Sequence, residues 1–163
     1  MPLLTPCKRH GRSSVSLNEL YREVILDHYR APRHHDHLEA PDGTAEGKNP
    51  LCGDEVTIEL KLDGGVVSEV GAIGVGCSIS QASASMMSEA VAGKELTEVE
   101  ELVRKFKVMM TIKESDEQVV DPERPGSVLG DLEALQGVRK FPVRIKCADL
   151  PWTTLEQALE QAG

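Results

Sequence analysis

The strongest constraint on the fold is a β-hairpin pattern in the middle of the chain. Residues 54–62 alternate between apolar and polar side chains, which is typical of a strand with one buried face. The Asp-Gly-Gly triplet at 63–65 is a strong hairpin turn, and residues 66–75 are expected to form the return strand, although two glycines interrupt it. The sequence therefore predicts two antiparallel strands whose outer ends meet at one edge of a sheet.

Helical signals surround this hairpin. Ser16 and Glu19 form a capping-box pattern at the start of a helix that ends before Pro32. A second helix is expected at about 78–92, with Gly93 as its stop. Three more patterns predict helices: a capping box at 97–100, a weak helical pattern at 128–135, and a capping box at 153–156 that opens the last helix. The polar segment 33–50 is expected to be a loop. This order indicates an α+β fold in which several helices cover one face of a small antiparallel sheet.

The composition fits one domain with an aliphatic core. Of the 163 residues, 40% are hydrophobic but only 3% are aromatic, so aliphatic side chains must supply the core. Residues 16–163 are expected to form a single domain with an insertion at about 107–140, in which no chemistry can be read. Residues 1–15 are basic, lack the apolar stretch of a secretory signal, and are expected to be a disordered extension.

The charge balance narrows the class of partner. The net charge is −9, which argues against nucleic acid or an anionic membrane as the main partner. No apolar run approaches the roughly 20 residues of a transmembrane helix. Four cysteines without a secretory signal indicate a reducing compartment, the cytoplasm, where thiols serve metals or catalysis more often than disulfides.

Three cysteines and one aspartate are placed where they can meet. Cys52 precedes the first strand of the hairpin and Cys77 follows the second, so both are expected at the same edge of the sheet. Asp54 shares the side-chain parity of Cys52 and of the apolar residues. The approach of Cys147 to this group cannot be derived from the pattern, and Cys7 lies in the basic extension.

A metal ion is the expected occupant of this group. A complete ligand set for Zn(II), and a plausible one for iron, is formed by Cys52, Asp54, Cys77 and Cys147. Three thiolates and a carboxylate around a divalent ion leave a net negative charge, which Arg144 and Lys146 could offset. The alternative, that the cysteines are only small buried residues, is disfavoured by the Cys-Gly-Asp triplet at the hairpin end. The histidine-rich stretch 33–37 is interpreted as a solvated loop rather than a metal site.

Three segments resemble a known family. The sequences CGDEV, GVGCSISQASASMM and FPVRIKC, in this order, resemble the IscU-like scaffold family, also called the NifU N-terminal-like family, over residues 17–162. Two details are similar to its SufU branch. Lys146 stands before the last cysteine where IscU-type scaffolds carry histidine, and Phe-Pro-Val-Arg replaces their Leu-Pro-Pro-Val-Lys segment. Cys77 and Cys147 are 70 positions apart, which also matches the longer insertion of that branch.

The resemblance implies a function in iron–sulfur cluster assembly. A SufU-type protein binds zinc through its three cysteines and aspartate and takes persulfide sulfur from a SufS-type cysteine desulfurase, for delivery to downstream cluster-assembly proteins. By this resemblance Cys52 is the expected sulfur acceptor, with Cys147 as the alternative. Arg144 and Lys146 would dock the partner or balance charge. Two other functions stay open: a scaffold on which a 2Fe-2S cluster is built, and an adaptor domain whose zinc is only structural. Whether the protein acts as an enzyme, a sulfurtransferase, stays open too.

Overall fold

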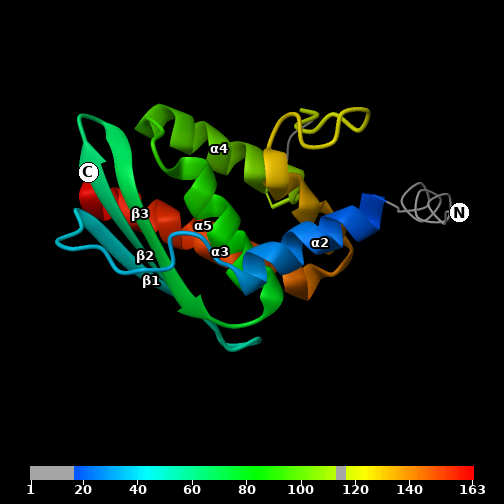
Figure 1. Ribbon diagram of the computed structural model, residues 1–163, viewed down its shortest axis with the longest axis horizontal. Coiled ribbons are helices and arrows are strands. Elements are labelled where there is room, and N and C mark those ends of the chain that lie inside the picture. Colours follow the sequence, from blue (N-terminus) through cyan, green and yellow to red (C-terminus); the bar gives the residue numbers. More distant parts are fainter. Residues whose placement is uncertain (1–16, 113–116) are drawn as a thin grey trace, which may run out of the picture.

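The computed structural model describes residues 17–112 and 117–163, so the predicted extension 1–15 lies outside the described part (Figure 1). Three strands form one antiparallel sheet in the order β1-β2-β3: β1 (Gly43–Asn49), β2 (Asp54–Asp63) and β3 (Val66–Val75). The helices are α2 (Leu17–Arg30), α3 (Ser78–Val91), α4 (Leu96–Met109), the 3-10 helix η1 (Gly130–Lys140) and α5 (Pro142–Ala162). The α+β architecture predicted from the sequence is confirmed.

The hairpin of β2 and β3 holds the centre of the sheet. Val56, Ile58 and Leu60 are buried, as the alternating pattern predicts. Gly64 and Gly65 both have positive φ, which the tight turn between the strands requires. Helix α5 packs against β1 and β2, α3 packs against β3, and α2 lies on α3 and η1 (Figure 1). The sheet thus presents one face to the helices.

Strand β1 corrects the prediction of a loop at 33–50. Its glycines gave the segment the composition of a loop, but they have a packing role. A β-carbon at Gly43 would collide with the carbonyl oxygen of Ala158, and one at Gly47 would collide with Thr154 Oγ1. The glycines therefore allow β1 to lie directly on α5, and the strand extends the hairpin into a three-stranded sheet.

Helix α5 corrects the prediction that the last helix begins after Cys147. It begins at Pro142 and continues through Pro151, so Cys147 lies inside it. Pro151 has no N–H to offer to the carbonyl of Cys147, one turn earlier. The Ser83 hydroxyl donates to the next carbonyl, that of Ala148, at 2.6 Å, and so stabilises the helix where the proline weakens it.

Two other helix boundaries differ from the predicted ones. The capping box of α4 is formed by Glu95 and Glu98, two residues before the predicted one, and the Glu95 N–H donates to Glu98 Oε1 at 3.2 Å. The weak pattern at 128–135 becomes η1, which begins at Gly130 with φ of 59°. The buried Glu133 carboxylate accepts three backbone N–H groups of residues 126–129 and so orders the segment before it.

The core is largely aliphatic, as the composition predicts. Its two large aromatic residues are Phe106 and Trp152, whose rings stack with centroids 4.3 Å apart and join α4 to α5. Met86 and Met87 are buried in α3, in agreement with a packing role. Within the described residues, no helix is both long enough and apolar enough to cross a bilayer.

Candidate metal centre

Cys52 lies in the short turn that joins β1 to β2. The carbonyl of Asn49 accepts the N–H of Cys52 at 3.2 Å, which closes the turn. Gly53 follows with φ of 70°, a conformation that favours glycine, and no atom lies near the position of its missing β-carbon. The Cys52 thiol is therefore partly exposed, on a turn with open space beside it.

Asp54 is the first residue of β2 and is 1% exposed. Its Oδ1 accepts the backbone N–H of Cys77 at 2.8 Å, and its Oδ2 lies 3.9 Å from Cys77 Sγ. Cys77 is the N-cap of α3, so its sulfur lies beside the positive end of the helix dipole. A β-carbon at Gly76 would collide with Asp54 Oδ1, so glycine is needed here for the carboxylate to approach.

Cys147 completes the group from the first half of α5. Its thiol is fully buried, and its Sγ lies 3.2 Å from Cys52 Sγ, too far for a disulfide. Ligand atoms of Cys52, Asp54 and Cys147 all lie within 4.8 Å of one another, and Cys77 adjoins this trio through Asp54. The structure thus brings together the three residues predicted to meet at the sheet edge. It also places Cys147 with them, which the sequence pattern could not do.

The donor set fits a tetrahedral zinc ion. Zn–S bonds of about 2.3 Å imply sulfur atoms about 3.8 Å apart in a tetrahedron. The separations of 3.2 Å between Cys147 and Cys52 and 3.9 Å between Cys77 and Asp54 are close to such edges. Thiolates and a carboxylate are also ligands that zinc prefers, and they suit iron as well. Cys52, Asp54 and Cys147 can therefore hold one metal ion, and Cys77, which contacts Asp54, has to move toward the other two thiols to act as the fourth ligand.

The electrostatics of the site favour a cation. Burial raises the pKa of the Cys147 thiol well above its usual value, and hydrogen bonds with Cys52 and Asp54 raise it further. The exposed Arg144 lies close by, and the negative charge of Cys77 and Cys147 raises the pKa of its guanidinium. A bound metal ion would reverse the effect on the thiols, because a coordinating thiol is deprotonated. Lys146 is exposed and, in the described part of the chain, makes no hydrogen bond or ion pair to the four residues.

Exposed apolar residues stand close in the sequence to the thiols of the site. We call them the apolar rim: Leu51, Val75, Phe141 and Val143, with exposed fractions of 70%, 64%, 59% and 54%. Leu51, Val75 and Val143 lie one to four positions from a cysteine, and Phe141 is the N-cap of α5. Sequence patterns did not single them out, because isolated exposed apolar residues are common and only their convergence is informative. The buried Asn49, which contacts Cys147, was also missed.

Other clusters do not form a competing metal site. His28, Glu89 and Asp131 lie within ion-binding reach of one another, but both ring nitrogens of His28 are already engaged, with Ser85 at 2.7 Å and Asp131 at 2.9 Å. Arg33 lies 3.7 Å from Glu89. In the histidine-rich loop, His35 and His37 bond to the Ala72 carbonyl and the Glu59 carboxylate. These contacts link structural elements and engage the imidazoles of His28, His35 and His37.

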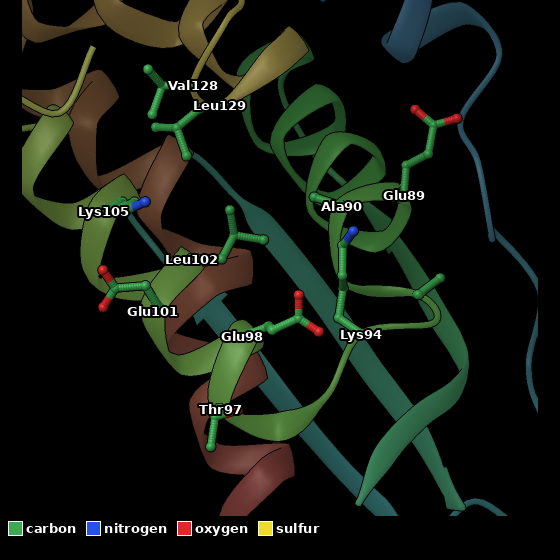
Figure 2. Close-up of a pocket in the computed structure, with 11 residues that line it drawn as sticks. Glu89, Ala90, Lys94, Thr97, Glu98, Glu101, Leu102, Lys105, Val128 and Leu129 are labelled. Atoms are coloured by element: carbon green, nitrogen blue, oxygen red, sulfur yellow. The ribbon is translucent and has the colours of Figure 1, made fainter.

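A separate cavity of about 590 Å³ lies between α3 and α4 (Figure 2). Val128 and Leu129 border it on one side, and Leu102 contributes apolar surface. Its charged lining consists of Glu89, Glu98, Glu101, Lys94 and Lys105. It has no thiol or imidazole in its lining, so the metal chemistry belongs to the cysteine site.

Comparison with known proteins agrees with the geometry. The NifU-like N terminal domain family matches residues 20–148. The zinc-dependent sulfurtransferase SufU of Bacillus subtilis (strain 168) is 44% identical over 152 residues, which cover 92% of this chain and 97% of that protein. The iron-sulfur cluster assembly scaffold protein IscU of Streptococcus pyogenes serotype M1 is 38% identical over 147 residues, covering 90% of this chain and 87% of that protein.

Solved structures support the same family. The crystal structure of a putative iron-sulfur cluster assembly scaffold protein for the SUF system, from Fervidobacterium islandicum AW-1, superimposes with a TM-score of 0.74. It is 38% identical in sequence, and the match covers 88% of this chain and 99% of that one. The family match spans most of the chain, and its relatives are matched over nearly their whole length. The chain therefore belongs to the IscU-like, NifU N-terminal-like family and, within it, to the SufU type.

Proposed function

We propose that this protein is a zinc-bound sulfur acceptor in iron–sulfur cluster assembly. It would take persulfide sulfur from a SufS-type cysteine desulfurase in the cytoplasm and pass it to downstream cluster-assembly proteins. The observation that supports this most is the contrast between two neighbouring thiols: Cys52 lies on a partly exposed turn, and Cys147, 3.2 Å away, is fully buried. The similarity to a zinc-dependent sulfurtransferase supports the same function.

The residues have distinct roles in this proposal. The ligands would be Cys52, Asp54, Cys77 and Cys147. Zinc, when bound, would keep the thiols deprotonated near neutral pH and protect them from oxidation. Asp54 holds the backbone of Cys77 through the hydrogen bond to its N–H and so fixes the start of α3 against the sheet. Cys52 is the acceptor, because its turn can move without disturbing a helix.

The transfer step conserves atoms and electrons. The Cys52 thiolate attacks the outer sulfur of the desulfurase persulfide, and a new S–S bond forms on Cys52. The S–S bond of the desulfurase breaks, and its electron pair leaves with the desulfurase cysteine as a thiolate. The transferred sulfur keeps its oxidation state and its proton equilibrates with solvent, so no external oxidant or reductant is required.

The surface around the site suits a protein partner. The residues of the apolar rim are exposed, and the exposed Arg144 adds positive charge close to Cys77 and Cys147. Apolar anchors and a complementary charge are typical of protein interfaces, with charge mainly affecting the rate of association. We propose that the rim and Arg144 contact the desulfurase, with Lys146 in a lesser role.

A 2Fe-2S scaffold is the second candidate function. The same four residues would hold iron, and relatives described as IscU scaffold proteins support this alternative. The two functions differ in what the cysteines receive: sulfur alone, or sulfide together with iron.

Transfer of labelled sulfur tests the proposal. The protein is incubated with a SufS-type desulfurase and radiolabelled cysteine, and the label on this chain is measured with and without a reductant. We expect reductant-labile label on the wild-type protein and its loss in Cys52→Ser. Label that persists on Cys52→Ser and disappears in Cys147→Ser would make Cys147 the acceptor. Absence of label on the wild-type protein would contradict the proposed function.

A further inference from the structure

Asn49 connects the two thiols that could accept sulfur. It is the last residue of β1, it pairs with Asp54 across the sheet, and it is only 8% exposed. A buried amide has to find hydrogen-bond partners for both its oxygen and its NH₂ group. The partners of Asn49 lie on the two sides of the candidate metal centre.

The orientation of the amide follows from its partners. Asn49 Oδ1 accepts the backbone N–H of Leu51 at 3.2 Å, an acceptor role that only the oxygen can fill. The NH₂ group therefore faces the other way, and Nδ2 donates to Cys147 Sγ at 3.7 Å. The backbone carbonyl of Asn49 also accepts the N–H of Cys52. One residue thus shapes the turn that presents Cys52 and contacts the sulfur of Cys147.

Because of these contacts, the thiols of Cys147 and Cys52 differ in burial and in hydrogen bonding. Cys147 is anchored on a helix, is fully buried, and accepts a hydrogen bond from Asn49. Cys52 lies on a turn, and in residues 17–112 and 117–163 no nitrogen donor is within hydrogen-bond distance of its sulfur. A buried sulfur that accepts a hydrogen bond from an amide stays in place more readily than a partly exposed sulfur that accepts none from nitrogen.

We propose that Asn49 is a positioning residue that directs incoming sulfur to Cys52 rather than to Cys147. This inference rests on the proposed function and deepens it. Asn49 covers Cys147 and holds its sulfur through the NH₂ group, and it shapes the turn so that Cys52 faces outward. Without the amide, Cys147 loses a cover and a hydrogen bond and becomes a competing acceptor.

Peptide mass spectrometry can locate the transferred sulfur. The full-length, as-purified protein is incubated with a SufS-type desulfurase and cysteine, alkylated and digested, and the ratio of persulfide on Cys52 to persulfide on Cys147 is measured. In Asn49→Ser the hydroxyl can still accept the Leu51 N–H, but the donor and the cover are lost. In Asn49→Asp the size and the acceptor are kept, the donor is lost, and a negative charge is added beside Cys147, which opposes formation of its thiolate. The exposed Asn18→Ser is the matched control.

We expect Asn49→Ser to lower the ratio by about five- to tenfold, the effect of one lost hydrogen bond, and Asn49→Asp to lower it less, with total sulfur per chain maintained in both. Asn18→Ser should keep the wild-type ratio. A general loss of structure would reduce total sulfur without moving it from Cys52 to Cys147, so the ratio is specific to positioning. If Asn49→Ser melts at a lower temperature, the ratio is measured at a temperature at which this variant is fully folded. An unchanged ratio in both variants would overturn the inference.

Zinc loss gives a second readout that does not need the desulfurase. The rate at which a chromogenic chelator removes zinc should rise about five- to tenfold in Asn49→Ser, because Cys147 is held less firmly. If no cysteine of the wild-type protein takes up sulfur, the proposed function fails. In that case the rate of zinc loss still tests the contact between Asn49 and Cys147. Faster loss from Asn49→Ser than from the wild-type protein supports the positioning role, and an equal rate overturns it.

Discussion

At the residue scale, Asp54 connects the fold to the candidate chemistry. One carboxylate oxygen accepts the N–H of Cys77 at the start of α3, and the other faces Cys77 Sγ. The residue is almost fully buried, and Gly76 leaves room for its carboxylate. Asp54 therefore combines a structural hydrogen bond with the metal-ligand role proposed for it, and substitutions can separate the two.

Two substitutions of Asp54 are expected to differ in stability but agree in zinc affinity. Asp54→Asn keeps an oxygen for the Cys77 N–H, whereas Asp54→Ala leaves this N–H without an acceptor, which costs about 1–3 kcal/mol. Both should weaken zinc binding by at least the roughly tenfold typical of perturbed metal sites. Competition with a chelator and thermal unfolding measure the two effects. Wild-type zinc affinity in Asp54→Asn would contradict the ligand role.

Arg144→Ala tests the docking role of the guanidinium. A charge at the edge of an interface mainly speeds association, so we expect a KM for this protein that is raised several-fold and depends less on salt. Lys146→Ala, an exposed change on the same helix, should have a smaller effect. Zinc content measured on both variants separates docking from charge balance. Unchanged KM together with unchanged kcat in Arg144→Ala would exclude docking by this residue.

At the element scale, the sequence predicted the parts of the fold that depend on short-range patterns. Alternation identified β2, and the Asp-Gly-Gly turn identified β3 as its partner. Strand β1 was missed because Gly43 and Gly47 are needed for close packing against α5, whose contacting residues lie more than a hundred positions later in the sequence. The start of α5 was missed because Pro151, a helix breaker by propensity, is accommodated by Ser83 and by close packing.

The glycine contact between β1 and α5 can be tested by two alanine substitutions. In Gly43→Ala the new β-carbon meets the Ala158 carbonyl, and overpacking of this kind costs about 1–3 kcal/mol. Gly137→Ala in η1 is the matched control, because its β-carbon meets no atom. Urea unfolding should therefore show a lower midpoint for Gly43→Ala and an equal or higher one for Gly137→Ala. Equal midpoints would mean that β1 does not pack on α5 as described.

At the scale of the whole molecule, the core extends far beyond the candidate metal centre. Buried aliphatic residues extend through β2, α3, α4, η1 and α5, and the burial of each large one stabilises the fold by about 1.5–3 kcal/mol. By contrast, structural zinc in small fingers supplies on the order of 10 kcal/mol and the apo form is unfolded. This protein has enough core to remain folded without its metal.

Chelation tests this independence. We expect the far-UV circular dichroism of the chelated protein to keep its helical signal, with only a lower melting temperature. The spectrum is recorded before and after zinc is removed and again after zinc is restored, so that irreversible damage is detected. Collapse to a random-coil spectrum would instead favour the adaptor function with purely structural zinc.

The site was predictable only in part, for a physical reason. Cys52, Asp54 and Cys77 could be placed together because an antiparallel hairpin brings its outer ends to one edge. Cys147 reaches them through the packing of α5 under the sheet, which no local pattern encodes. The resemblance to a family supplied that residue, and Asn49 became visible only from its contact with Cys147.

The measurement that tests the central claim most directly is cysteine desulfurase turnover with and without this protein, with metal content determined on the same sample. The account predicts a colourless protein with about one zinc per chain, as one tetrahedral site requires, that strongly stimulates turnover. This stimulation should be lost in Cys52→Ala. No stimulation, with iron and sulfide bound in place of zinc, would contradict the account and assign the protein to cluster scaffolding.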